Sequence, residues 1–340
     1  MVRAALPLDL GPLGSLEGLL TEGDDYRLVP TSGGGAWMIP ADRRARGPLR
    51  FLVAPPTRRA QWALRALALG LAVGLPVGVS ETLRNEAGTL VGISSPRVAI
   101  YVGTQGAYRK ALVFVAGEEG QGAVIKWALL PGADGAVERE YEALRYLSGV
   151  VEVKGTMPTP LTSGRWHGRL YFVMCPLLGR LGGRRLLGLH WDWAARLFSL
   201  ERKILRWEES PFRQCLSRIL KAPLPHVETL RTALGTLDHM LGGRFLSFGW
   251  AHRDFAPWNL RVRRGALVVL DWEMAVPAAP PGYDLLHFLA IQAALAGKAV
   301  RWPLAVFQKW LEGVAPDWVP LLPGVVLSYL LDQASIYHVA

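Results

Sequence analysis

Apolar stretches in the middle of the chain have the length and composition of β-strands. Three of them are rich in β-branched residues and are separated by short turns, at residues 97–103, 109–117 and 122–128. Such stretches predict neighbouring strands joined by tight connections. A further apolar stretch at 169–180 predicts another strand, so we expect a small sheet in this region.

The segment between the third and fourth stretches has helical periodicity. Within residues 134–149, apolar side chains recur at the spacing of one helix face, at Val137, Tyr141, Leu144 and Leu147. Asp134 is the expected N-cap residue and Gly149 the expected end. Glu140 shares the apolar face and therefore points toward the core.

Helical spacing dominates the second half of the chain. It covers most of residues 181–243 and resumes after Asp284. Between these regions, the basic turn RVRRG (261–265) is followed by the apolar run ALVVL (266–270), which predicts a short hairpin.

The first 95 residues show a separate pattern. Residues 37–41 and 49–55 resemble short strands, and residues 58–74 have the pattern of a helix. We therefore expect a small α/β extension. The glycine-rich segment 32–36 lacks the Lys-Ser/Thr ending of a Walker A motif and does not lead into a helix, so a flexible turn is the favoured interpretation.

Composition sets limits on the class of protein. With 340 residues the chain can bury a sizeable core. Its two cysteines, Cys175 and Cys215, lie far apart and are expected to be core residues rather than metal ligands or a disulfide. Prolines interrupt both apolar candidates for a membrane segment, at the N-terminus and at residues 66–79, so we expect no transmembrane segment and a cytoplasmic location.

The net charge of +10 bears on possible ligands. A site for polycationic aminoglycosides needs many carboxylates, which a basic chain is poorly suited to provide. No nucleic-acid-binding motif is recognisable, so no nucleic-acid partner is expected.

The residues needed for phosphoryl transfer cluster at 252–284. His252, Arg253 and Asp254 are followed by Asn259, and the predicted hairpin leads into Asp271. A carboxylate can orient an attacking hydroxyl, while an amide oxygen and a second carboxylate can hold Mg²⁺ against nucleotide phosphates.

This region resembles the aminoglycoside phosphotransferase and choline kinase superfamily, the small-molecule branch of the protein-kinase-like fold. The matching motifs are H-x-D-x-x-x-x-N at 252–259, D-W-E at 271–273 and a Gly and an Asp opening an apolar helix at 282–286. The resemblance implies an α+β, two-lobed protein-kinase-like fold. It would comprise the N-terminal extension at 1–95, a small lobe at 96–175 and a mostly helical large lobe at 176–340.

The resemblance also implies roles for individual residues. Asp254 would be catalytic, and Asn259 and Asp271 would bind Mg²⁺. The ATP-binding residues would be the loop residues Gly103, Thr104 and Gly106, the phosphate-contacting Lys126, its partner Glu140, and Met174 and Cys175 at the adenine-binding hinge. Glu138 and Glu142 compete with Glu140, because a small error in helix register would change the assignment.

The expected activity is ATP-dependent transfer of the γ-phosphoryl group to a hydroxyl of a small molecule. The interval between Asp271 and Asp284, with the Pro/Ala-rich turn at 276–282, is too short for the activation loop of a protein kinase. The alternatives are an ATP-binding pseudokinase or scaffold, and a nucleotidyl transferase on the same fold. The acceptor and the oligomeric state cannot be predicted from the sequence.

Overall fold

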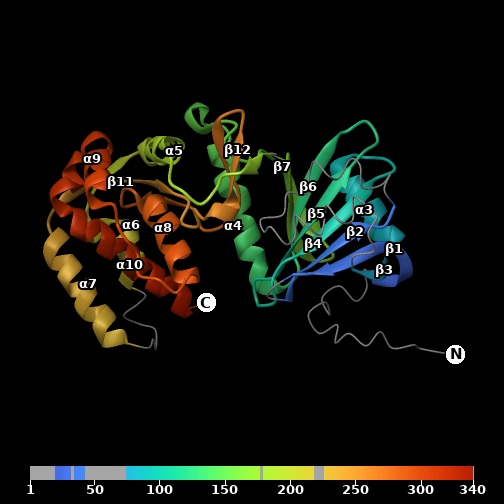
Figure 1. Cartoon of the computed structure of the whole chain (residues 1–340), viewed down its shortest axis with the longest axis horizontal. Helices are drawn as coiled ribbons and strands as arrows, with labels where there is room; N and C mark the ends of the chain where they lie inside the picture. The colour runs from blue at the N-terminus through green and yellow to red at the C-terminus, as the bar shows by residue number, and fades with distance from the viewer. Residues whose placement is uncertain (1–19, 32–33, 43–73, 177–178, 218–225, 340) are drawn as a thin grey trace. The chain divides into compact units, whose positions relative to one another are not determined.

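The computed structural model describes residues 20–31, 34–42, 74–176, 179–217 and 226–339. The chain divides into two compact units, Met1–Val150 with Met157–Arg180, and Val151–Thr156 with Leu181–Ala340. We call them the sheet unit and the helical unit. Their combination of strands and helices confirms the predicted α+β class (Figure 1).

The sheet unit is built on one antiparallel sheet of eight strands in the order β3-β1-β2-β4-β5-β6-β8-β7. The strands predicted in the middle of the chain are all present in it. They are β4 (Arg97–Val102), β5 (Lys110–Ala116), β6 (Gly122–Ala128) and β8 (Arg169–Met174), with β7 (Pro160–Trp166) beside β8.

The N-terminal extension continues this sheet (Figure 1). It contributes β1 (Leu20–Pro30), β2 (Ala36–Pro40), β3 (Leu75–Val79) and α3 (Glu81–Val91). The predicted strand at 37–41 corresponds to β2, which pairs with β4. The predicted strand at 49–55 and, except for Gly74, the predicted helix at 58–74 lie outside the described residues, as do Ser32 and Gly33 of the predicted glycine-rich turn.

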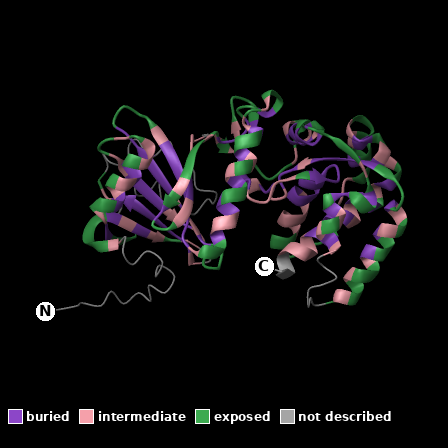
Figure 2. Ribbon diagram, turned by 180° about the vertical axis from the view of Figure 1, so that it is seen from behind, coloured by how far each residue is buried: buried purple, intermediate pink, exposed green. Residues whose placement is uncertain are grey.

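Helix α4 (Pro131–Leu147) packs on β6, β7 and β8. One face of the helix is buried (Figure 2), formed by Ala133, Ala136, Val137, Glu140, Leu144 and Leu147. The prediction that Asp134 is the N-cap residue is wrong. The helix begins earlier because Pro131 suits a first turn, where no backbone N–H is required. The Asp134 carboxylate instead accepts a hydrogen bond from the Leu170 N–H at 2.9 Å.

The helical unit contains two small sheets and several helices. The sheets have the orders β10-β11-β14 and β13-β12-β9. Their strands are β9 (Arg180–Leu181), β10 (Lys203–Arg206), β11 (Phe245–Ala251), β12 (Leu260–Arg263), β13 (Ala266–Val269) and β14 (Val276–Ala279). The helices are α5 (Gly188–Ser199), α6 (Pro211–Leu216), α7 (Val227–Leu241), α8 (Tyr283–Leu295), α9 (Leu304–Val314) and α10 (Leu322–Val339). Short 3-10 turns are η3 (Val151–Val153), η4 (Trp207–Glu209), η6 (Pro257–Asn259) and η7 (Pro316–Leu321).

The strands β10, β11 and β14 of this unit were not predicted. β10 interrupts the region expected to be mostly helical, and β14 occupies residues expected to form only a turn. Both pair with β11. Within the described part of the chain, β14 has no strand on its other side, and such an edge position tolerates Pro277, which cannot donate a ladder hydrogen bond.

Several tryptophans of the helical unit lie in its core. Trp193 and Trp207 are fully buried. Trp191 is half-buried, and its ring centroid lies 6.1 Å from that of Trp310. Cys175 and Cys215 are free and partly exposed, so they are less buried than core residues.

Among the residues that the structure describes, one segment, Pro316–Ile336, is long and apolar enough to span a membrane when only length and composition are considered. A core helix of a soluble protein passes the same test. In this structure the segment packs against α7 and α8. It also carries the buried Asp332, whose carboxylate pairs with Arg253, so its contacts are those of a core helix.

We predict that Gly282→Ala destabilises the helical unit more than Gly297→Ala does. Both glycines have a left-handed backbone, with φ of 72° and 62°. A Cβ at Gly282 would lie 2.1 Å from the Phe307 ring, whereas one at Gly297 would meet nothing within 4 Å. Backbone strain costs each variant about 1–2 kcal/mol. Overpacking adds about 1–3 kcal/mol at Gly282 only. Equal losses in urea-induced unfolding would contradict the predicted clash.

Candidate active site

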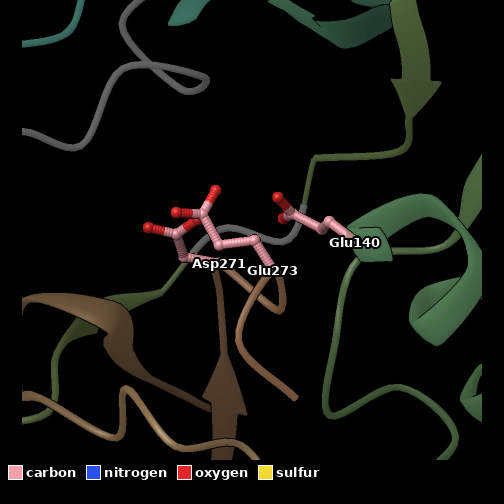
Figure 3. A group of neighbouring side chains, drawn as sticks. All are labelled: Glu140, Asp271 and Glu273. Atoms are coloured by element: carbon pink, nitrogen blue, oxygen red, sulfur yellow. The ribbon is translucent and has the colours of Figure 1, made fainter. Parts of the chain in front are cut away.

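Lys126 and Glu140 form a buried ion pair in the sheet unit. Lys126 lies on β6 and is 5% exposed. Glu140 projects from α4 (Figure 3) and is 1% exposed. The Lys126 ammonium donates a hydrogen bond to the Glu140 carboxylate. Of the three glutamates that the sequence left open, Glu140 is therefore the one that pairs with Lys126. Glu142 instead bonds Arg145 on the exposed side of the helix.

Both charged groups of this pair are shielded from water, which determines its energetic effect. Desolvating two charges costs several kcal/mol, and their mutual attraction offsets this only with good geometry. Such a pair is therefore weak evidence for stability. Its clearest structural effect is to fix the position of the Lys126 ammonium on the sheet.

Gly103, Thr104 and Gly106 lie in the connection between β4 and β5. The Gly103 N–H donates to the Lys110 carbonyl at 2.8 Å, which closes the base of the loop. A Cβ on Gly103 would lie 3.1 Å from the same carbonyl oxygen, so this position is tight. Gly106 has φ of 150° and open space around it. The loop is thus anchored at Gly103 and uncrowded at Gly106.

Met174 and Cys175 lie at the end of β8. Met174 is opposite Val124 and Pro160 in the sheet register. The Cys175 N–H donates to the Thr159 carbonyl at 2.9 Å. A nucleotide base that accepted a hydrogen bond from the Cys175 N–H would therefore have to compete with this bond.

Asp254 and Asn259 lie together in the helical unit. The Asn259 side-chain amide donates to the Asp254 carboxylate Oδ2 at 2.8 Å and to the Asp254 carbonyl at 3.0 Å. Asn259 is buried, while the Asp254 side chain remains 31% exposed. Because Nδ2 is committed to Asp254, Oδ1 is the amide atom that could bind a metal. The five-residue spacing thus orients the carboxylate and leaves it accessible.

His252 links this loop to the segment that carries Asp271. Its Nδ1 accepts a hydrogen bond from the Asp254 N–H at 3.2 Å, and its Nε2 lies 3.0 Å from the Leu270 carbonyl. Through these two contacts the ring connects the backbone at Asp254 with the backbone at Leu270. The fully buried Trp272 packs edge-on against His252, with ring centroids 4.8 Å apart.

Asp284 fixes the backbone immediately before Asp254. Its two carboxylate oxygens accept from the His252 N–H at 3.0 Å and the Arg253 N–H at 2.9 Å. Burial raises the pKa of Asp284, although His252 and the two N–H donors oppose this effect. Arg253 has φ of 66°, which is uncommon for a residue other than glycine. The hydrogen bonds of Asp284 hold the loop in this conformation.

The Arg253 side chain joins the loop to α10. Its guanidinium binds both carboxylate oxygens of Asp332, each at 2.7 Å. The Tyr283 hydroxyl donates to the same carboxylate. Burial alone would lower the pKa of Arg253, but Tyr283 and Asp332 reverse this and raise it above its ordinary value. The arginine is therefore charged and committed to an internal anchor.

Asp271 and Glu273 provide the acidic groups after β13. Both side chains are partly buried, and they offer ligand oxygens within 4.8 Å of each other (Figure 3). Asp271 also has a left-handed backbone, with φ of 68°. Carboxylate and amide oxygens are the ligands that Mg²⁺ prefers, so Asp271, Glu273 and the Asn259 amide have suitable chemistry. The sequence identified Glu273 within a motif but assigned it no role.

His287 is a further neighbour of Asp254 that the sequence reading missed. Its Nε2 lies 3.4 Å from Asp254 Oδ1, within ion-pair range but outside hydrogen-bond geometry. The ring is buried, and its Nδ1 lies 3.3 Å from the Tyr329 hydroxyl. His287 follows Asp284 by one helical turn on α8. This spacing could have indicated that His287 lies near the loop, because residues three apart share a helix face.

Comparison with known proteins identifies the family. The model of the phosphotransferase enzyme family, APH, matches residues 108–318, which is more than half of the chain. The chain belongs to this family, and its fold is the protein-kinase-like α+β fold expected from the sequence. No curated protein sequence matches it.

Solved structures with detectable similarity are distant. Aminoglycoside phosphotransferase APH(4)-Ia in a ternary complex with ADP and hygromycin B is 15% identical, with a TM-score of 0.49 and coverage of 76% of this chain and 92% of that one. The amicoumacin kinase hAmiN bound to AMP-PNP, Ca²⁺ and Ami is 14% identical, with a TM-score of 0.48 and coverage of 76% and 85%. APH(3'')-Id from Streptomyces rimosus, with ADP and streptomycin, is 15% identical, with a TM-score of 0.43 and coverage of 66% and 90%.

We predict that Asp332→Ala lowers the free energy of unfolding by about 3–5 kcal/mol, because it leaves the buried Arg253 guanidinium without its anionic partner. Chemical denaturation measures this loss. Glu228→Ala is the matched control, since it breaks the exposed Glu228–Arg231 pair on α7 and should change stability little. Similar effects of the two substitutions would show that the Arg253 anchor is not important for stability.

Proposed function

We propose that this protein is a cytoplasmic small-molecule kinase that transfers the γ-phosphoryl group of ATP to a hydroxyl group. The observation that carries the proposal is the accessible Asp254 carboxylate, oriented by the Asn259 amide in a chain of the phosphotransferase family. A carboxylate in such a position can accept or orient the proton of an attacking hydroxyl.

Each unit contributes a distinct part of the proposed chemistry. In the sheet unit, Lys126 neutralises charge on the nucleotide phosphates, Glu140 holds Lys126, and the loop with Gly103, Thr104 and Gly106 offers backbone N–H groups. Backbone groups near Met174 and Cys175 hold the base, with the Cys175 carbonyl favoured because its N–H is already donated. In the helical unit, Asp254 acts on the acceptor.

Asn259 and Asp271 are the proposed ligands of Mg²⁺, and Glu273 is an additional acidic group beside Asp271. A bound Mg²⁺ would neutralise phosphate charge and orient the nucleotide. The remaining catalytic contribution comes from positioning, because hydrogen bonds to the Asp284 carboxylate hold the loop before any substrate arrives.

The proposed acceptor is a small hydroxylated molecule without several positive charges. The chain carries 38 Lys and Arg residues against 28 Asp and Glu residues, a balance that does not favour polycations. A panel of hydroxylated metabolites, with an aminoglycoside included, would identify the acceptor by following ADP release.

Two measurements test the reaction. Isothermal titration should show binding of Mg·ATP at millimolar nucleotide or below, and absence of binding would overturn the proposal. Mass spectrometry of the acceptor should then show the gain of one phosphate. Gain of a nucleotide would instead identify a nucleotidyl transferase, and binding without any product would identify a pseudokinase or scaffold.

We predict that Asp254→Asn and Asp271→Asn impair different steps. Asp254→Asn should leave Mg·ATP affinity nearly intact and lower turnover by roughly 10²–10⁴-fold, the contribution typical of an acid–base group. Asp271→Asn should weaken Mg·ATP binding as well, because the metal loses an anionic ligand. Nucleotide titration and initial rates separate the two effects.

Glu312→Gln, on the exposed face of α9, is the control for loss of one carboxylate and should change neither property. If Asp254→Asn abolished nucleotide binding while Asp271→Asn retained it, the two roles would have to be exchanged.

A further inference from the structure

The N-terminal extension reaches the loop proposed to cover the nucleotide phosphates. β2 pairs with β4 in a register that ends at Ala36 opposite Val102, directly before Gly103. Gly35 lies so close to this point that a Cβ there would be 2.8 Å from the Val102 carbonyl oxygen. Gly34 and Gly35, described residues of the turn between β1 and β2, thus lie against the start of the loop.

Arg109, at the other end of the loop, connects the two segments. Its Nε donates to the Gly103 carbonyl at 3.2 Å, and its Nη2 donates to the Gly34 carbonyl at 2.9 Å. The residue is only 5% exposed. Both partners are neutral backbone carbonyls, and burial lowers the pKa of Arg109. The guanidinium therefore spans the base of the loop and fastens it to the extension.

The backbone of Arg109 is held as well. Its N–H donates to the Gly106 carbonyl at 3.2 Å, and its carbonyl accepts from the Leu129 N–H at 3.0 Å. With the backbone fixed, the side chain cannot follow Gly34 without moving the loop. A movement of Gly34 would therefore displace the Arg109 guanidinium and, through it, the backbone at Gly103.

We propose that the N-terminal extension is a brace for the nucleotide-binding loop and that Arg109 is the positioning residue through which it acts. The inference rests on the proposed function and assigns a role to residues that precede the segment matched by the family model. A loop held before ATP arrives loses less conformational freedom on binding, which strengthens affinity without any new contact to the ligand.

The test uses the full chain with Arg109→Gln and Arg109→Lys. Arg109→Gln should weaken binding of Mg·ATP and Mg·ADP by roughly tenfold, the size of one lost charge-assisted hydrogen bond. Turnover at saturating ATP and the KM for the acceptor should stay unchanged. Arg109→Lys should be similarly impaired, because one ammonium cannot reproduce the forked contact with two carbonyls. Full affinity in Arg109→Lys would show that charge alone is needed and would overturn the brace.

Arg165→Gln is the matched control. Arg165 also donates to a backbone carbonyl, that of Gly168 at 3.2 Å, but it is an exposed contact on β7. Its loss should leave nucleotide affinity unchanged. An equal loss of affinity in Arg165→Gln would contradict a specific role for Arg109.

Amide hydrogen exchange without nucleotide separates this inference from the proposed function. Residues 103–108 should exchange faster in Arg109→Gln than in the wild type, and unchanged exchange would overturn the inference even if ATP binds. If the wild type binds no ATP, the proposed function fails while the exchange result still decides whether the brace exists. Gly34→Ala, strained at φ of 75°, perturbs the brace from the extension side and provides the same exchange readout if Arg109→Gln does not fold.

Discussion

The buried carboxylate of Asp284 is the constraint on which the loop of residues 252–259 depends. It lies in the first turn of α8, where the helix dipole favours a negative charge, and it accepts hydrogen bonds from two consecutive loop N–H groups. These bonds fix the path of the chain just before Asp254. A loop with unpaired N–H groups at this depth would be costly, so the anion is needed for the loop as well as for the helix.

The conformation that Asp284 maintains is strained. Arg253 and Asp271 both have positive φ, and both lie in the segments that carry the candidate catalytic and metal-binding groups. Strain of this kind persists only where surrounding contacts over-determine the backbone. At Arg253 those contacts include the bidentate pair with Asp332 on α10. His252 adds a link from the loop to Leu270, so the two strained segments support each other.

The sequence was informative where structure is local. β4, β5 and β6 could be predicted because each is a continuous apolar run. Asp254 and Asn259 could be grouped in one candidate site because they are only five residues apart. β1 could not, because residues Thr21–Asp25 are polar and exposed and the register with β3 is irregular there. Asp332 also escaped prediction, since it reaches Arg253 from 79 positions further along the chain. Distant partners of this kind are determined by packing, which carries no short-range pattern.

Burial separates two acidic residues of the helical unit, Asp284 and Asp332, from Asp254. Asp284 and Asp332 are almost fully buried, and their oxygens are committed to N–H donors of the loop and of Arg253. Asp254 differs, because Asn259 occupies one oxygen while the other faces His287 outside hydrogen-bond geometry. A carboxylate whose two oxygens already accept internal hydrogen bonds cannot orient a further donor without weakening one of those bonds. The proposed action on an incoming hydroxyl is therefore assigned to the partly exposed Asp254, whose neighbours Asn259 and His252 hold it in place.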